Sequence, residues 1–162
     1  MSLKDILLLG DPRLYKISSS VVQEELEKLK PSIEIMHNAL MEFREKYGAG
    51  RAVAAPQIGL LKRFIYMHID KPQLIINPEL YDFSDEKMEV WDDCLCFSGL
   101  LVKVKRAKSV KLKYRDVNWD EQVWVLEGDL SELIQHEYDH LDGILATQRA
   151  IDELSFKMIK AT

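Results

Sequence analysis

Long apolar runs, an excess of basic residues and widely spaced cysteines are all missing from this 162-residue chain. No apolar stretch approaches the roughly 20 residues that cross a bilayer. The short apolar run at residues 6–9 follows an acidic residue, so we expect neither a membrane span nor a secretory signal. The formal net charge is −5, whereas proteins that bind nucleic acids without sequence preference are usually strongly basic. We expect a cytoplasmic protein without specific nucleic acid binding, either monomeric or homodimeric.

The two cysteines, Cys94 and Cys96, lie only two positions apart. On a strand such residues point the same way and a disulfide between them would be strained, so we expect no structural disulfide within the chain. Apolar residues make up 47% of the chain and charged residues 30%, which is the composition of a globular protein. The length suits one domain over residues 1–162.

Apolar periodicity predicts helices near both ends of the chain. The first begins near Gln23, is interrupted at Pro31 and continues over residues 32–47 until Gly48 stops it. The second opens at residue 130, where Asp129 and Glu132 form the expected cap, and ends at residues 142–143. A short terminal helix is expected over residues 151–159.

Strands are predicted between these helices, where apolar and polar residues alternate. They cover residues 61–69, 74–76, 88–97, 101–104, 109–114 and 123–126, with turns at residues 77–78 and 118–120. Because helices do not alternate with strands along the chain, the pattern favours an α+β fold with antiparallel sheets over a doubly wound one.

Residues 136–140 read His-Glu-Tyr-Asp-His, an HExxH pattern on the second expected helix. Positions four apart share a helix face, so His136 and His140 can bind one metal ion while Glu137 lies beside it. A hydrolytic metal site usually has three protein ligands and one open position. The residues alone leave the third ligand open, and the candidates are Cys94, Cys96, His37, His68 or an acid after the helix.

Three segments in series resemble the signature motifs of the peptide deformylases. Residues 50–57, GRAVAAPQ, resemble a Gly-apolar-Gly-apolar-Ala-Ala-x-Gln loop. Residues 92–99, DDCLCFSG, resemble the EGCLS motif, and residues 136–140 resemble the HExDH motif. Residues 10–14, GDPRL, and Arg106 extend the resemblance over most of the chain. It implies an α+β fold in which antiparallel sheets surround a central helix that carries HExxH.

The resemblance also implies a reaction and the residues that perform it. The reaction is hydrolysis of the N-formyl group from N-formylmethionyl peptides, nascent chains or a related formylated amine, with release of formate. One divalent metal ion is implied, natively Fe²⁺, with Zn²⁺, Ni²⁺ or Co²⁺ as other occupants. The implied metal ligands are Cys94, His136 and His140. Glu137 would be the catalytic acid and base, Gln57 and the Leu95 backbone NH the oxyanion donors, and Asp92 with Arg106 a supporting ion pair.

Several residues depart from the family pattern where a substrate would bind. Arg51 stands at a usually apolar position, Ala52 replaces a glycine and Asp93 replaces the glycine before the expected ligand. Leu101 stands where many bacterial members carry an arginine, and Glu132 where an apolar residue would favour methionine. Cys96 replaces a serine and is interpreted as a small buried side chain. The expected substrate contacts are Arg51, Ala52, Asp93 and Leu133.

Other functions compete with this one. A catalytically inactive relative could keep the metal and bind formylated N-termini or a protein partner. An HExxH metalloprotease would use a downstream acid such as Glu153 as third ligand in place of Cys94. A purely structural zinc site is a further alternative, although three ligands beside an acid leave an open position, which favours catalysis.

Overall fold

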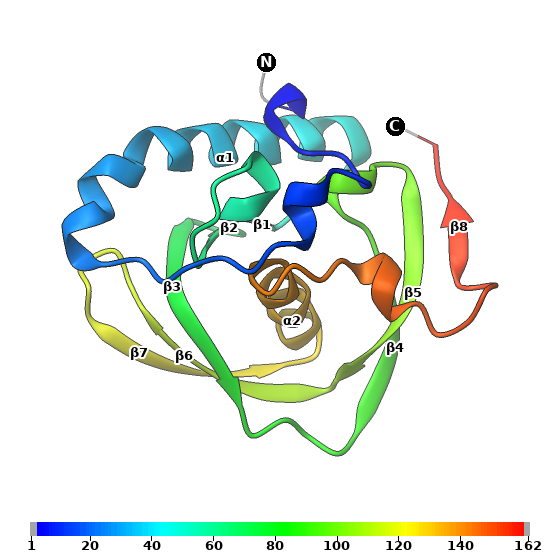
Figure 1. Cartoon of the computed structure of the whole chain (residues 1–162). Coiled ribbons are helices and arrows are strands. Elements are labelled where there is room, and N and C mark those ends of the chain that lie inside the picture. Colours follow the sequence, from blue (N-terminus) through cyan, green and yellow to red (C-terminus); the bar gives the residue numbers. More distant parts are fainter. Residues whose placement is uncertain (1–2, 161–162) are drawn as a thin grey trace.

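Two antiparallel sheets surround one buried helix in the computed structural model, which describes residues 3–160 (Figure 1). Residues 1, 2, 161 and 162 of the predicted domain lie outside the described residues. The α-helices are α1 (Leu26–Tyr47) and α2 (Asp129–Leu141). The larger sheet has the order β1-β2-β3-β6-β7 and contains β1 (Ala52–Ala54), β2 (Phe64–His68), β3 (Pro72–Tyr81), β6 (Ser109–Arg115) and β7 (Glu121–Glu127). The smaller sheet has the order β4-β5-β8 and contains β4 (Lys87–Asp92), β5 (Leu100–Ala107) and β8 (Phe156–Met158). This arrangement confirms the predicted α+β class.

The apolar core lies on both faces of the larger sheet, as β2 illustrates. Phe64 and Tyr66 belong to the cluster beneath α1, whereas Ile65 and Met67 belong to the cluster around α2. Successive side chains of a strand point to opposite faces, so a strand covered on both sides needs a continuous apolar run. The run therefore reflects the position of β2 between the two helices (Figure 1).

Helix α2 is held against the end of β5 by polar side chains. Ser131 donates from Oγ to the Ala107 carbonyl at 2.8 Å, and Gln135 both donates to that carbonyl and accepts from the Ala107 NH, at 2.9 and 3.1 Å. Buried polar groups require such partners. These bonds fix the rotation of α2, and with it the direction in which the HExxH side chains point.

Two predicted helix boundaries are wrong. Helix α1 runs through Pro31, because this residue is exposed in an early turn, where water can solvate the carbonyl that loses its helical NH partner. A separate 3₁₀ helix, Gln23–Glu25, precedes it. The predicted cap at Asp129 is also wrong: Asp129 is the first helical residue, Gly128 occupies the cap position, and within residues 3–160 no side-chain hydrogen bond caps the helix there.

Three predictions about strands and the C-terminus also need correction. The expected turn at residues 77–78 is a bulge inside β3, where Asn77 has a positive φ of 50° and bonds the backbone of Val21. The expected strand over residues 88–97 ends at residue 92, and residues 95–97 form a 3₁₀ helix. In place of the expected terminal helix over residues 151–159, β8 pairs with β5 and satisfies backbone groups at the edge of that strand.

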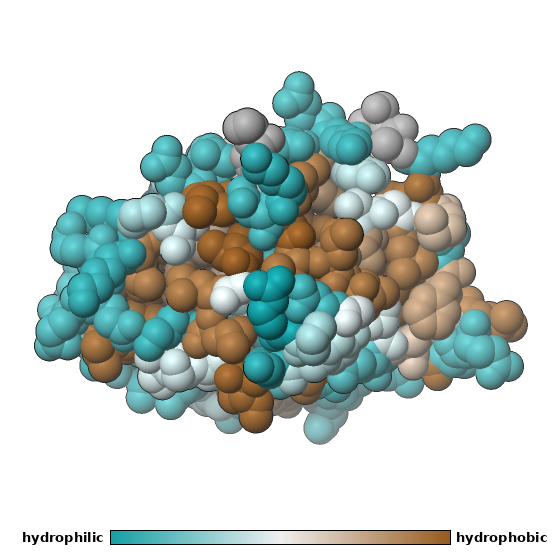
Figure 2. All heavy atoms as spheres, turned by 45° about the horizontal axis from the view of Figure 1, so that its top comes forward, coloured by the Kyte–Doolittle hydropathy of each residue, from teal (hydrophilic) through white to brown (hydrophobic). Residues whose placement is uncertain are grey.

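The surface mixes polar and apolar residues. Large apolar side chains that stay exposed come partly from the N-terminal segment and the region around β8, including Leu8, Ile17, Leu154 and Met158. Figure 2 shows apolar residues gathered across the middle of one face, where some hydrophilic residues interrupt them, with further hydrophilic residues at its margins. Within residues 3–160, no helix is both long and apolar enough to cross a membrane.

Candidate metal centre and active site

Three potential metal ligands meet at the centre of the fold. The ligand atoms of Cys94, His136 and His140 all lie within 4.8 Å of one another, and all three residues are buried. The Cys94 sulfur lies 3.4 Å from His140 Nε2, and the two imidazole rings are 5.2 Å apart, centre to centre. The histidines come from successive turns of α2, whereas Cys94 follows β4. One thiolate and two imidazoles suit a tetrahedral or related centre with one open position.

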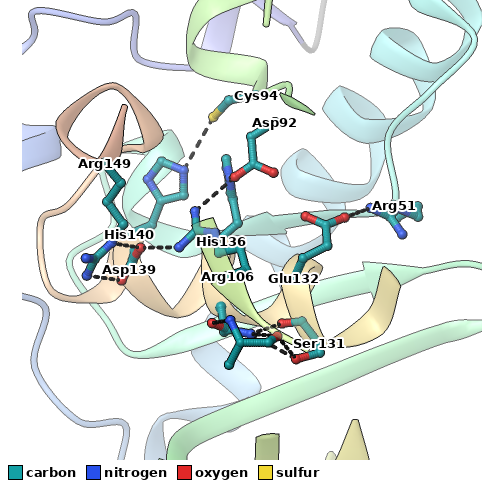
Figure 3. Close-up of polar contacts among 12 residues, drawn as sticks. Arg51, Asp92, Cys94, Arg106, Ser131, Glu132, His136, Asp139, His140 and Arg149 are labelled. Carbon is teal, nitrogen blue, oxygen red and sulfur yellow. Dashed lines mark hydrogen bonds and ion pairs between the residues drawn. The ribbon is translucent and has the colours of Figure 1, made fainter. Parts of the chain in front are cut away.

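A chain of charged groups supports His136 from behind (Figure 3). Asp92 accepts a hydrogen bond from His136 Nδ1 at 3.0 Å and is paired with Arg106 at 2.9 Å. Arg106 also contacts Asp139 at 2.8 Å, and Asp139 is paired with Arg149 at 2.6 Å. A hydrogen bond at Nδ1 leaves Nε2 of His136 to face a metal ion and fixes the ring orientation.

The electrostatics of this chain follow from its burial. Burial opposes the charged form of Asp92, but the hydrogen bond from His136 and the charge of Arg106 hold the pKa of Asp92 well below its usual range. Burial alone would lower the pKa of His136; its hydrogen bond with Asp92 and the charge of that carboxylate outweigh burial and raise this pKa to about 9. Asp92 thus remains an anion that can support a cation at His136.

Cys94 and His140 respond differently. Burial, with the neighbouring Cys96, raises the pKa of the Cys94 thiol, while burial and the charge of His136 lower the pKa of His140. The neutral imidazole of His140 is the form that binds metals. A divalent cation holds a coordinating thiol in its deprotonated form, so the donor set fits such an ion.

Glu137 lies beside the three ligands and is buried. Its Oε1 has no hydrogen-bond partner among the described residues. Burial raises the pKa of Glu137 to about 7, although the charge of His136 opposes this effect. A carboxyl group with a pKa near neutrality can both accept and donate a proton, as a general acid and base must.

Gln57 approaches the same point from the segment after β1. Its Oε1 accepts a hydrogen bond from the Ala54 NH at 2.8 Å, which directs its NH₂ group toward the sulfurs of Cys94 and Cys96 at 3.4 and 3.3 Å. Leu95 begins the 3₁₀ helix that follows Cys94, and the first NH groups of a helix have no partner within it. The amide of Gln57 is thereby directed at Cys94, and Leu95 is the next residue after Cys94.

A cavity of about 120 Å³ opens beside these groups. Its lining includes the predicted substrate contacts, two predicted oxyanion donors and Glu132, namely Arg51, Ala52, Asp93, Leu133, Gln57, Leu95 and Glu132. Arg51 Nη2 and Glu132 Oε1 form an ion pair of 2.6 Å across the cavity wall (Figure 3). Burial, with the charge of nearby Asp92, raises the pKa of Glu132 to about 7.

Other candidates from the sequence lie elsewhere. His37 is on α1, where its Nδ1 lies 2.7 Å from the Tyr66 hydroxyl, and its ring is 5.6 Å from that of His68. Glu153 is exposed in the turn before β8. Leu101 lies on β5 opposite Lys157, outside the residues that line the cavity. Neither histidine belongs to the Cys–His–His group.

Some contributors to the site were missed by the sequence analysis. The pairing of Arg51 with Glu132 joins residues 81 positions apart, and no local pattern reveals it. Arg149, which holds Asp139, follows an undistinguished stretch after α2. The contact of Gln57 with Cys96 was not predicted either. The one sequence feature that points to it is that Cys96 replaces the serine of the EGCLS motif.

A thiolate, two imidazoles on one helix and a buried carboxyl group beside them define the class of metal-dependent HExxH hydrolases. Comparisons with known proteins identify the family within that class. Residues 3–155 match the model of the polypeptide deformylase family. The peptide deformylase of Thermotoga maritima is 34% identical over 145 residues, which cover 89% of this chain and 85% of that protein. The peptide deformylase of Dictyoglomus thermophilum is also 34% identical, covering 93% of this chain and 95% of that protein.

Solved structures agree with the sequence relatives. The crystal structure of the Thermotoga maritima peptide deformylase has a TM-score of 0.82 and 33% identity, covering 91% of this chain and 97% of that chain. A peptide deformylase from Synechococcus elongatus in complex with actinonin has a TM-score of 0.84 and 29% identity, covering 93% of this chain and 80% of that chain. The chain belongs to the polypeptide deformylase family, a family of metal-dependent hydrolases. The predicted family, fold class and enzymatic function are confirmed.

Proposed function

We propose that residues 1–162 form one catalytic domain that removes the formyl group from N-formylated peptide and nascent-chain N-termini, with Cys94, His136 and His140 as the ligands of one divalent metal ion. The main support is that these three buried ligand atoms lie within 4.8 Å of one another, next to the Glu137 carboxylate oxygen that has no hydrogen-bond partner among the described residues. A purely structural site would have no use for a buried, unpaired acid, which costs folding free energy.

The roles of the protein residues follow from their positions. When bound, the metal ion supplies Lewis-acid polarisation and lowers the pKa of water. Glu137 takes a proton from the attacking water and delivers it to the departing amine nitrogen, so that formate and a free N-terminus result. Its pKa of about 7 suits both transfers near neutral pH.

Gln57 and the Leu95 NH donate hydrogen bonds to the formyl oxygen as negative charge develops there, where such donors are most effective. The Ala54 NH holds the Gln57 carbonyl oxygen, so the amide needs little reorganisation. The formyl oxygen replaces the Cys96 sulfur as the acceptor of one Gln57 NH. Asp92 and Arg106 act as positioning residues, because Asp92 orients His136 through its Nδ1 and Arg106 holds the Asp92 carboxylate.

Thiolate and imidazole donors suit several divalent ions, and we propose Fe²⁺ as the native one, with Zn²⁺, Ni²⁺ and Co²⁺ able to occupy the site. The enzyme is proposed to act in the cytoplasm on newly made chains, without specific nucleic acid binding, as a monomer or homodimer.

The proposal is tested by formate release. Protein loaded with Fe²⁺ without oxygen should release formate from formyl-Ala and formyl-Met peptides. Cys94→Ala should lose both metal and turnover, whereas the matched variant Cys96→Ala should keep its metal. The proposal is contradicted if metal-loaded protein releases formate from neither peptide, or if Cys94→Ala retains its full metal content.

A further inference from the structure

An ion pair occupies part of the wall of the active-site cavity. Glu132 lies on α2, one turn before His136, and its side chain is 12% exposed. Arg51 belongs to the segment that leads into β1, and its side chain is 37% exposed. Figure 3 shows Glu132 between Asp92 on one side and Arg51 on the other.

The two partners differ in how firmly they are held. Glu132 projects from a buried helix that Ser131 and Gln135 fasten to β5. The Arg51 backbone is fixed by the His68 NH at 2.8 Å, but its long side chain reaches solvent. Arg51 can therefore turn outward into water when another cation takes its place on Glu132, because water can solvate its partly exposed guanidinium. Glu132 cannot follow it.

The charges that line the cavity are unequal in number. Asp92 is already neutralised by Arg106. Glu137 transfers protons in the proposed function and is therefore not counted as a partner for a substrate side chain. Asp93 and Glu132 are then the acids that remain on the cavity side beside Arg51, and a second cation near Glu132 would favour its ionised form. A ligand that brings a positive charge compensates this imbalance and gains a charge-assisted hydrogen bond. An apolar side chain instead desolvates the carboxylate and the guanidinium without pairing either.

We propose that Glu132 is a specificity-determining residue that directs this enzyme toward formylated peptides whose first side chain is positively charged, with that charge taking the place of Arg51 on the Glu132 carboxylate. The inference rests on the proposed function and names the substrate class within it. Formyl-Met peptides are still hydrolysed, but less efficiently than formyl-Lys peptides.

Two measurements test the inference. The first is kcat/KM for formate release from formyl-Lys, formyl-Met and formyl-Ala peptides that are otherwise identical. Formyl-Ala is the reference, because its methyl group is small and carries no charge. Formyl-Lys should exceed formyl-Met by about ten- to a hundredfold, the range of one hydrogen bond to a charged group.

Variants separate Glu132 from general effects of charge. Glu132→Leu should reverse the preference in favour of formyl-Met, and Arg51→Leu should increase the preference for formyl-Lys, because a competing cation is removed. Asp129→Asn is the matched control: it removes the same charge from the exposed first residue of α2 and should leave the ratio unchanged.

The second measurement is equilibrium binding of the formyl-Lys and formyl-Met peptides to metal-loaded Glu137→Gln, with and without Glu132→Leu. This reports selectivity without turnover. If metal-loaded wild type releases no formate from formyl-Ala, the proposed function fails, and the binding ratio still decides the inference. A ratio that favours formyl-Met, or one that Glu132→Leu does not change, overturns the inference even when formyl-Ala is hydrolysed.

Discussion

Replacing Arg106 with leucine should destabilise the protein strongly, because Arg106 is the shared partner of two buried acids. Its guanidinium is 3% exposed and lies 2.9 Å from Asp92 and 2.8 Å from Asp139. Removing one member of a buried ion pair typically costs about 3–5 kcal/mol, since an uncompensated charge remains. Asp139 keeps Arg149 and Asp92 keeps His136, which places the expected loss at the lower end, about 3 kcal/mol.

Urea unfolding in the presence of a metal chelator measures this loss. With an m-value of about 2 kcal/mol/M, a loss of about 3 kcal/mol lowers the urea midpoint by about 1.5 M. Lys105→Leu is the matched control, because Lys105 is the preceding residue of β5 and is exposed. It should shift the midpoint by no more than a few tenths of a molar unit.

The same substitution should weaken metal binding, because Arg106 fixes the carboxylate that orients His136. Loss of such an outer partner typically reduces metal affinity by about 10- to 100-fold, which chelator competition can measure. The reasoning is refuted if Arg106→Leu changes the midpoint and the affinity no more than Lys105→Leu does.

Three further predictions concern single residues. The folded-state pKa of Glu132 is raised from 4.5 to about 7, so the folded protein binds more protons in this window and wild-type stability falls as pH rises through it. Glu132→Gln should reduce the loss of unfolding free energy between pH 5 and pH 8 by about 1–3 kcal/mol, as measured by the urea midpoints at the two pH values. A variant with the same difference between the two midpoints as wild type would contradict the raised pKa. Gly143→Ala should lower the unfolding free energy measured by urea denaturation by at least about 2 kcal/mol, because Gly143 has φ of 73° and a Cβ there would lie 2.5 Å from the Tyr15 carbonyl. An unchanged free energy would mean that Gly143 does not lie so close to Tyr15. Gln57→Ala should lower kcat for formate release about 10²- to 10³-fold with little change in KM, and an unaltered kcat would remove Gln57 from the oxyanion site.

The helix that carries HExxH was predictable from the sequence because its signal is local. Two histidines four positions apart and an apolar face define both the element and the direction of the ligands. The proposed third ligand was less predictable. Residue types alone left two cysteines, two histidines and an acid after the helix as candidates, and it was the resemblance to a known motif that pointed to Cys94. Its proximity to His140 depends on how the segment after β4 lies against α2, which no local pattern encodes.

The errors have a common physical origin in tertiary contacts. Residues 151–159 carry apolar side chains at spacings that also fit a helix, but the open edge of β5 offers backbone partners that favour a strand. Pro31 was read as a helix break, yet its exposure allows the helix to continue. Arg51 and Glu132 were each noticed as departures from the family pattern, but only the fold shows that the two departures neutralise one another.

The central claim is that Glu137 performs proton transfer at a metal centre built by Cys94, His136 and His140. The most direct test compares formate release by wild type and Glu137→Gln at equal, measured metal content. The variant should keep one metal ion per chain and lose about 10²- to 10⁴-fold in kcat, the usual contribution of a general acid and base. A variant that keeps wild-type turnover with its metal bound would contradict the claim.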